Sequence, residues 1–234
     1  MRRFQFALAT GVAMLAATQA FAAAPCRTSG SFDQWLANFK QEAQAQGISR
    51  NAIAQASPFL VYDQRIVNID RGQRVFAQSF IEFSTKMLPG GRISQGIAQI
   101  KKNAATFARA EQQYGVPPAV IAGFWGLESD FGANMGKDQA LRSIVSLAYD
   151  CRRADMFRGH LFDALRLIER GDLSAPEMIG SWAGELGQTQ MMPSEYYIYA
   201  VDYEGDGHRN LLRSAADVIG STADAWSMTD RAPH

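Results

Sequence analysis

The chain has 234 residues, of which 47% are hydrophobic and 20% are charged, with 23 basic against 23 acidic residues. This composition suits one globular domain with a substantial core, and it excludes disordered, collagen-like and coiled-coil chains. Without Arg2 and Arg3, which belong to the leader described next, the balance is 21 against 23, or −2. We therefore expect no nucleic acid partner, since the chain has no basic field to attract one.

The first 22 residues have the pattern of a secretion signal peptide. Two arginines precede an apolar stretch over residues 4–17, and Ala20-Phe21-Ala22 fits a cleavage site with small residues. A membrane anchor is the alternative, but the stretch is short and rich in alanine. We predict a signal peptide over residues 1–22, a mature domain over residues 23–234 with no transmembrane anchor, and a periplasmic location.

Cys26 and Cys151 are the two cysteines of the chain. In an oxidising compartment a disulfide between them is a reasonable prediction. Two unpaired thiols remain the alternative, because the sequence does not give the separation of the two residues in the fold.

Most of the chain beyond the leader has the hydrophobic period of amphipathic helices. A capping pattern at Ser31 and Gln34 predicts the start of a helix, and a second, shorter helix is expected over residues 49–56. The segment "VYDQRIVNIDRG", residues 61–72, is predicted to be extended. Residues 89–91, Pro-Gly-Gly, predict a loop.

The second half continues with helices. A long helix is predicted over residues 94–114 with Gly115 at its end, and Pro117 and Pro118 suit the first turn of the next helix. Further helices are expected over residues 140–149, 154–170, 175–182, 193–200 and 214–226. The predicted fold class is mainly α, with helices packed against one another and little or no sheet.

One carboxylate, Glu128, lies in an unusually apolar helix, "VIAGFWGLESDFGANMG" at residues 120–136. Burial disfavours the charged form of a carboxyl group and so raises its pKa, which suits a general acid acting near neutral pH. The alternative is a glutamate at a helix end that reaches solvent or caps a loop. Asp130 is the nearest other acid, but two residues further on it points to a different side of the helix.

The segment "YGVPPAVIAGFWGLESDFGANMG", residues 114–136, closely resembles the catalytic segment of the membrane-bound lytic transglycosylase B family of bacterial cell-wall enzymes. The stretches "DCRR", "SWAGELGQTQMMPSEYYIYAVDYEGDGH" and "ADVIGSTADAW" agree in order and spacing, so the similarity covers roughly residues 30–226. The resemblance implies a lysozyme-like helical fold. It also implies cleavage of the β-1,4 bond between N-acetylmuramic acid and N-acetylglucosamine in peptidoglycan glycan strands, leaving a 1,6-anhydro sugar, with Glu128 as the single catalytic acid.

The stretch "SWAGELGQTQMMPSEYY" provides candidate substrate-binding residues. Ser181 and Gln190 can donate hydrogen bonds to sugar hydroxyl or acetamido groups, and the resemblance implies that they are polar cleft residues. Met192 and Tyr196 can offer apolar surface to sugar rings, although ordinary core packing is the alternative for both. Glu185, a charged position inside the motif, is expected to be solvated.

Arg152 and Arg153 match a basic pair of the family. They could bind carboxylates of the substrate or of its peptide stems, or they could be the solvated start of a helix.

The stretch "DYEGDGHRNLLR", residues 202–213, resembles a calcium loop. Position 12 is Arg213, where a standard loop has a bidentate glutamate, and the resemblance suggests Asp217 as the final carboxylate. A metal-free acidic turn is the alternative, and no cofactor is expected for the chemistry itself. The expected oxygen ligands of a structural calcium ion are Asp202, Glu204, Asp206, the His208 carbonyl and Asp217.

The resemblance stops after Trp226, and "SMTDRAPH" matches nothing that the family has there. We therefore interpret residues 23–234 as a lytic transglycosylase catalytic domain truncated at its C-terminus. A non-catalytic peptidoglycan-binding protein is the second interpretation. An ordinary muramidase is the third, and it needs a second carboxylate that the sequence does not locate.

Overall fold

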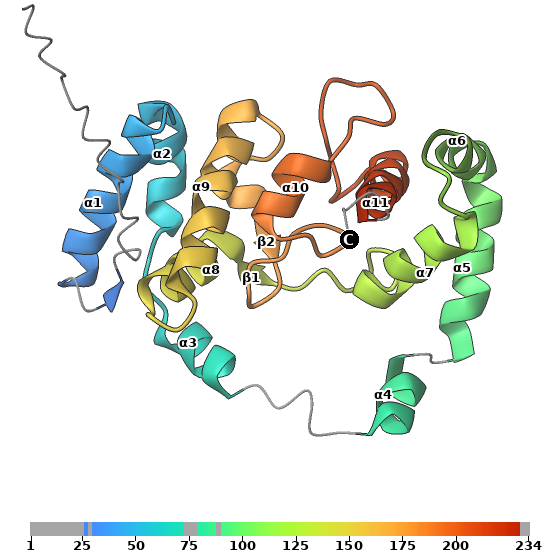
Figure 1. Ribbon diagram of the computed structural model, residues 1–234, viewed down its shortest axis with the longest axis horizontal. Coiled ribbons are helices and arrows are strands. Elements are labelled where there is room, and N and C mark those ends of the chain that lie inside the picture. The colour runs from blue at the N-terminus through green and yellow to red at the C-terminus, as the bar shows by residue number, and fades with distance from the viewer. Residues whose placement is uncertain (1–25, 28–29, 73–78, 88–89, 230–234) are drawn as a thin grey trace, which may run out of the picture.

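The computed structural model describes residues 26–27, 30–72, 79–87 and 90–229 (Figure 1). The predicted signal peptide lies outside the described residues. Within them, no helix combines the length and the apolar character that crossing a membrane requires. The helices are α1 Phe32–Ala45, α2 Arg50–Ala56, α3 Gln64–Arg71, α4 Phe80–Met87, α5 Gly90–Lys102, α6 Ala104–Tyr114, α7 Pro118–Ser129, α8 Ala140–Tyr149, α9 Ala154–Arg170, α10 Pro193–Tyr199 and α11 Ala215–Thr229.

Short elements complete the chain. The 3-10 helices η2 Ser57–Phe59 and η4 Ala175–Glu177 follow α2 and α9. Strands β1 Asp138–Gln139 and β2 Ile179–Gly180 pair antiparallel, with Asp138 opposite Gly180. The prediction of a mainly α fold with little sheet is confirmed.

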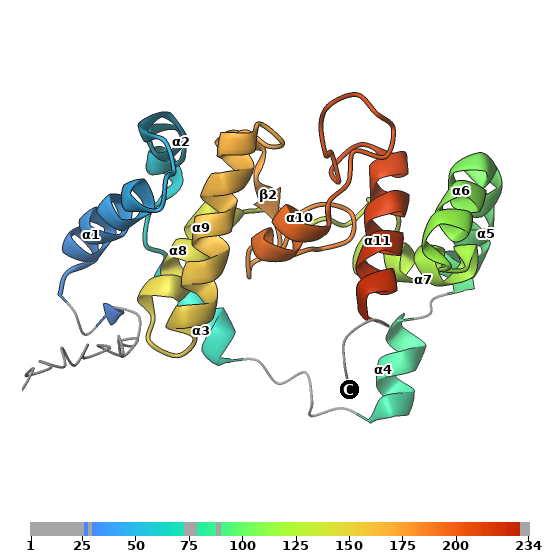
Figure 2. The same ribbon diagram turned by 45° about the horizontal axis from the view of Figure 1, so that its top comes forward.

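The helices form two groups that meet around α10 and α11 (Figures 1 and 2). The chain starts with α1–α3, crosses to α4–α7 at the other end of the molecule, and returns through β1 to α8 and α9, which pack against α3 and α2. Helix α10 packs on α9, and α11 packs against α6 and α7. This path brings α7 next to the segment between β2 and α11, which the sequence places about 60 residues later.

Aromatic side chains fill the core where α1 meets α9. The rings of Trp35 and Phe39 stack with centroids 5.8 Å apart, and Phe39 lies 4.7 Å from Phe162 on α9. All three are buried, and full burial of one such side chain contributes roughly 1.5–3 kcal/mol. The apolar period of α1 and α9 therefore forms one continuous core.

The predicted disulfide is present. Cys26 and Cys151 are bonded, with 5.2 Å between their Cα atoms and 125 residues between them in the chain. The bond ties the beginning of the described chain to the turn between α8 and α9.

The prediction of an extended segment over residues 61–72 is wrong, because residues 64–71 form α3. Asp63 caps this helix by accepting a hydrogen bond from the Arg65 amide at 2.9 Å. Ile66 and Val67 are fully buried, and α3 packs on α8. Tertiary burial here overrides the strand preference of the β-branched residues.

Three other predictions differ from the structure. The helix expected over residues 94–114 is two helices, α5 and α6, separated at Asn103, and Gly90 and Gly91 begin α5 instead of forming a loop. The helix expected over residues 175–182 is replaced by η4 and β2. A Cβ on Gly180 would lie 1.9 Å from the Glu185 carbonyl oxygen, so glycine is required where this strand meets the following turn.

Candidate active site

Helix α7 carries Glu128 one residue before its end. Pro118 occupies the first turn. At the other end, Asp130 and Phe131 adopt left-handed backbone angles, with φ of 48° and 58°, that turn the chain away. Gln188 holds this end in place: its side-chain oxygen accepts a hydrogen bond from the Trp125 indole N–H at 2.9 Å. The position of Glu128 is therefore fixed by a buried polar contact to a distant segment.

A small cavity of about 70 Å³ lies beside Glu128. It is formed by α7, by the segment before α10, and by α11. The rings of Phe124 and Trp226 pack with centroids 4.1 Å apart, so α7 and α11 close it together. The cavity is lined by Phe124, Glu128, Thr189, Met191, Thr222, Ala225 and Trp226.

The pKa of the Glu128 carboxyl is raised. The main cause is desolvation by the surrounding protein, and the negative charges of Glu185 and Glu195 add to it. The residue as a whole remains exposed, so its carboxyl is crowded by neighbours yet open to a ligand on one side. A carboxyl group in this setting keeps its proton to higher pH and can donate it.

Ser181 and Glu185 form a second polar group, close enough to Glu128 for the charge of Glu185 to act on it. The Ser181 hydroxyl donates to the Glu185 carboxylate at 2.6 Å and accepts the amide of Ala183 at 3.1 Å. The expectation that Glu185 is simply solvated is therefore wrong. Its carboxylate fixes the direction of the serine hydroxyl.

Gln190 and Met192 lie on the same segment, on either side of Met191. The Gln190 side-chain amide donates to the carbonyl oxygens of Gly187 at 2.8 Å and Met135 at 3.2 Å, which leaves its oxygen to accept from a ligand. Met192 is half-buried, and its backbone N–H donates to Glu195 at 3.0 Å at the start of α10. Their contact with substrate stays a prediction.

Tyr196 is not a cleft residue, and the prediction of a substrate contact is wrong for it. The side chain is 0% exposed. Its hydroxyl donates to the Arg209 carbonyl oxygen at 2.7 Å and accepts the Leu211 amide at 2.9 Å. Tyr196 therefore holds the loop before α11 onto α10.

Arg152 and Arg153 lie next to the disulfide, in a hollow that does not include Glu128 among its lining residues. Both bind Asp70, whose carboxylate is 2% exposed, and Arg152 does so through two nitrogens at 2.7 and 2.8 Å. Both arginines neutralise a buried acid at the end of α3. Their contact with peptide stems stays a prediction.

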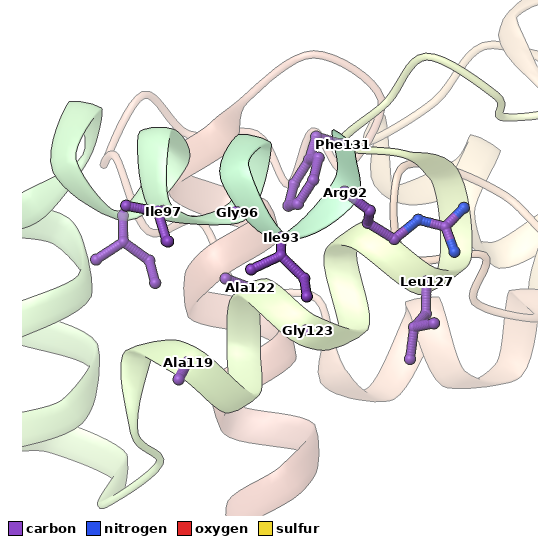
Figure 3. A pocket seen from close by; sticks show the side chains of 10 residues that line it. Arg92, Ile93, Gly96, Ile97, Ala119, Ala122, Gly123, Leu127 and Phe131 are labelled. Carbon is purple, nitrogen blue, oxygen red and sulfur yellow. The ribbon is translucent and has the colours of Figure 1, made fainter. Parts of the chain in front are cut away.

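A larger, apolar groove of about 230 Å³ runs between α5 and α7 (Figure 3). Figure 3 shows Ile93, Leu127 and Phe131 along it, and its charged lining residue is Arg92. The Arg92 guanidinium donates to Asp130 at 2.7 Å, and this hydrogen bond is the main cause that lowers the pKa of Asp130. The groove's lining includes no acid, whereas Glu128 lines the smaller cavity, so the smaller cavity is the candidate site for proton transfer.

The expected calcium ligands do not gather around a common centre. In the part of the chain that the structure describes, no group of three or more His, Cys, Asp or Glu side chains could hold a metal ion. Asp202 accepts the amides of residues 205–207 at 2.7–3.0 Å. Asp217 is fully buried and accepts the amides of Tyr203 and Asn210, each at 2.7 Å.

Glu204, Asp206 and His208 complete the expected ligand set. Glu204 donates its amide to Asp217 at 3.2 Å, and Asp206 accepts the His208 amide at 2.8 Å. Carboxylate–amide hydrogen bonds within the chain therefore organise this loop, and the arrangement does not fit the predicted calcium site.

Residues 31–227 match the Transglycosylase SLT domain family. The chain is 36% identical to membrane-bound lytic murein transglycosylase B of Escherichia coli K12 over 148 residues, which is 62% of this chain and 40% of that protein. Among solved structures, SltB3 of Pseudomonas aeruginosa in complex with NAG-NAM-pentapeptide superposes with a TM-score of 0.81 at 35% identity, covering 85% of this chain and 53% of that one.

A second solved structure is lytic transglycosylase Slt35 of Escherichia coli in complex with calcium. It superposes with a TM-score of 0.72 at 29% identity, over 82% of this chain and 62% of that one. The chain thus spans about half the length of these relatives. The similarity agrees with the lysozyme-like helical fold that the sequence predicts.

Proposed function

The chain belongs to the Transglycosylase SLT domain family, and from this premise we propose that it is a peptidoglycan lytic transglycosylase. It cleaves the β-1,4 bond between N-acetylmuramic acid and N-acetylglucosamine without water and leaves a 1,6-anhydro end. The observation that carries the proposal is Glu128, a single carboxyl group with a raised pKa at the edge of a small cavity.

The reaction uses Glu128 twice. Its protonated carboxyl first donates to the glycosidic oxygen, so the leaving sugar departs as an alcohol. The resulting carboxylate then accepts the proton of the muramic acid C6 hydroxyl while that oxygen bonds to C1. The nucleophile is part of the substrate, so holding it near C1 replaces an encounter with water. The proton balance closes within one residue, and no second carboxylate is required.

The nearby polar groups support this chemistry. The Ser181 hydroxyl donates a hydrogen bond to Glu185 at 2.6 Å, which orients it. The same hydroxyl oxygen can accept a hydrogen bond from a sugar substituent, or its proton can be shared between Glu185 and the sugar. The side-chain nitrogen of Gln190 donates to two backbone carbonyl oxygens, so its side-chain oxygen can accept a hydrogen bond from the sugar. These groups would hold the sugar next to the acid.

Peptidoglycan glycan strands are the proposed substrate and partner, and the periplasm is the proposed location. Structures of SltB3 contain NAG-NAM-pentapeptide and NAG-anhNAM-pentapeptide, and the relative in Escherichia coli is named as membrane-bound. Together with the leader pattern over residues 1–22, these relatives support export to the compartment that contains the cell wall.

Product analysis tests the proposed function. Purified protein and its Glu128→Gln variant are incubated with cell-wall sacculi, and soluble fragments are identified by mass spectrometry. Anhydro ends from the wild type, and none from the variant, are expected. Reducing ends would instead indicate a muramidase, with Glu185 or Glu195 as the second acid. Binding without any product would indicate a peptidoglycan-binding protein.

Calcium has a separate test. Slt35 was solved with calcium, but the carboxylates of Asp202 and Asp217 accept hydrogen bonds from backbone amides in this chain. We therefore expect the melting temperature of chelator-treated protein to be unchanged by millimolar calcium. A rise in melting temperature would restore the predicted site, because a ligand that binds the folded state stabilises it.

A further inference from the structure

The apolar side chains that remain exposed are concentrated on three helices at one end of the molecule. Among the described residues, twelve large hydrophobic side chains are exposed, and seven of them lie on α4, α5 and α7. Phe80 and Ile81 of α4 are 78% and 70% exposed, and Ile93 of α5 is 63% exposed. Exposed apolar side chains that gather in this way mark an interaction surface. We call the exposed side chains of these three helices the apolar face.

The groove between α5 and α7 gives this face room to take up an apolar group. Ile93, Ile97 and Ile100 follow at spacings of four and three residues, so they form one stripe along α5. Helix α7 offers Gly123 and Leu127 on the opposite wall (Figure 3). The space between the two walls is about 230 Å³, which is several times the roughly 30 Å³ of one water molecule.

Positive charge accompanies the apolar face. Helices α4 and α5 carry four basic residues and one acidic residue, Glu82, whereas the whole chain is balanced at 23 against 23. Arg92 is bonded to Asp130 at 2.7 Å. Lys101 and Lys102 are exposed in the last turn of α5, directly after the isoleucine stripe. The face therefore combines apolar side chains with a local surplus of cations that the net charge of the chain conceals.

An anionic lipid bilayer matches both properties. Its phosphate groups attract exposed lysines, and its acyl region removes apolar side chains from water. A second copy of the chain matches only the apolar part, because a symmetric contact through this face would bring Lys101 and Lys102 of both copies together. No described helix is long and apolar enough to cross a membrane, so the face would lie on the bilayer surface.

We propose that the apolar face of α4, α5 and α7 is a peripheral docking surface for an anionic phospholipid bilayer. Lys101 and Lys102 contact the phosphate groups, and Phe80, Ile81 and Ile93 enter the boundary between phosphate groups and acyl chains. Glu128 lines a separate cavity on the α11 side of α7, so docking leaves the candidate active site uncovered.

Sedimentation with lipid vesicles tests the proposal. The protein is residues 23–234, because the apolar leader would itself bind lipid. Vesicles of phosphatidylglycerol and phosphatidylcholine in equal parts are compared with vesicles of phosphatidylcholine alone. Each exposed lysine should strengthen binding to the anionic vesicles roughly fivefold, so we expect at least tenfold tighter binding to them, and weaker binding as salt is added.

Two substitutions of equally exposed isoleucines separate the apolar face from the rest of the surface. Ile93 of α5 and Ile198 of α10 are both 63% exposed. Ile93→Ser should weaken binding to the anionic vesicles roughly tenfold, because the side chain no longer gains from leaving water. Ile198→Ser is the matched control and should leave binding unchanged.

A second pair of variants tests the charge. Replacing Lys101 and Lys102 together by glutamine should weaken binding to the anionic vesicles tenfold or more, as estimated from roughly fivefold per charge. Replacing Lys40 and Arg142 together by glutamine removes the same net charge from α1 and α8. This control should bind the anionic vesicles nearly as well as the unsubstituted protein.

Three results would overturn the inference. They are equal binding to the two kinds of vesicle, an absence of binding, and equal losses for Ile93→Ser and Ile198→Ser. Gel filtration gives an independent check, since a dimer that Ile93→Ser dissociates would assign the face to a second copy of the chain instead. Vesicle binding requires no cleavage, so it can succeed or fail whether or not the protein releases anhydro products from sacculi.

Discussion

Helices α8 and α9 differ from α4 and α5 in how their apolar side chains are covered. Most residues of α8 are buried, whereas no residue of α4 or α5 is buried among those that the structure describes. Ile144 of α8 is 0% exposed, but Ile97 of α5 is 50% exposed and Phe80 of α4 is 78% exposed. The same residue types thus build a rigid core at one end and an open apolar surface at the other.

The candidate active site lies between these two regions and depends on both. Helix α7 contacts α5 on the side of the apolar groove, and its Glu128 side faces the cavity formed with α11. The segment carrying Ser181 and Gln190 leads into α10, which packs on α9. The acid therefore belongs to the more open region, and the groups that would hold the sugar belong to the packed one.

The largest expected effect is a loss of catalytic rate without a loss of stability, which distinguishes the active site from the packing of either region. Glu128→Gln should lower the rate of cleavage by roughly 10³-fold or more, because a neutral amide can neither donate the proton nor accept it afterwards. Its melting temperature should stay near that of the wild type, since the side chain is exposed. Glycan cleavage and thermal unfolding measure the two effects on the same preparations. Near-normal turnover would show that another group is the acid.

A matched pair of substitutions tests the contrast between the regions directly. Ile144→Ala removes a fully buried side chain and should cost about 2–5 kcal/mol in the free energy of unfolding. Ile97→Ala removes the same atoms from a half-exposed position and should change stability by no more than about 0.5 kcal/mol. Urea unfolding followed by circular dichroism gives both values. Similar losses would mean that α5 is packed more tightly in solution than its exposure indicates.

The sequence predicts helix boundaries best in the packed region. The bounds expected for α8 and α9 agree with the structure, because their apolar positions meet partners that cover them. The sequence pattern does not predict helix α4, and it predicts a loop at the start of α5, since Gly90 and Gly91 are typical of turns. The sequence pattern does not show which apolar helix face packs against another element. It is therefore least informative for helices such as α4 and α5, whose apolar faces remain exposed.

The candidate site was predictable only in part for a related reason. Glu128, Ser181 and Gln190 stand in motifs that can be read along the chain. Trp226 reaches the cavity because α11 lies against α7, and Thr189 because the segment before α10 is bonded to α7 through Gln188. No local sequence pattern indicates either contact. The prediction for Tyr196 is wrong because an aromatic side chain suits a sugar ring and a protein core equally well. The two hydrogen bonds of its hydroxyl join it to residues 209 and 211. These bonds show that Tyr196 has the structural role, and they cannot be read from the local sequence.

The disulfide provides the next test, now within the packed region. Replacing both Cys26 and Cys151 by serine should cost about 2–5 kcal/mol in the free energy of unfolding, because the cross-link restricts the unfolded chain. The rate of glycan cleavage at a temperature where the variant is folded should change little, since these residues lie in a hollow that excludes Glu128. Chemical denaturation with and without reductant measures the loss. If reductant destabilised the serine variant as much as the wild type, the loss of stability would not come from breaking the disulfide.

The smallest expected effect concerns the charges around Glu128. Glu185 and Glu195 are the acidic groups that add to burial in raising its pKa. Glu185→Gln removes one negative charge, so the pKa of Glu128 falls, and the acid loses its proton at lower pH. Because the protonated form is the active one, the alkaline limb of the pH–rate profile should move to lower pH. At pH 7 the rate should fall roughly two- to fivefold, and by less at pH 5.

Glu177→Gln is a close control for this last substitution. Glu177 accepts a hydrogen bond from Ser174 at 2.6 Å, the same distance as between Ser181 and Glu185, but its charge is not among those that act on Glu128. It should leave the pH profile unmoved, although losing a hydrogen bond lowers stability by a similar amount in both variants. A loss of rate in Glu185→Gln that is equal at all pH values would mean that Glu185 only holds Ser181. A shift of the alkaline limb would mean that Glu185 also raises the pKa of Glu128 through its negative charge.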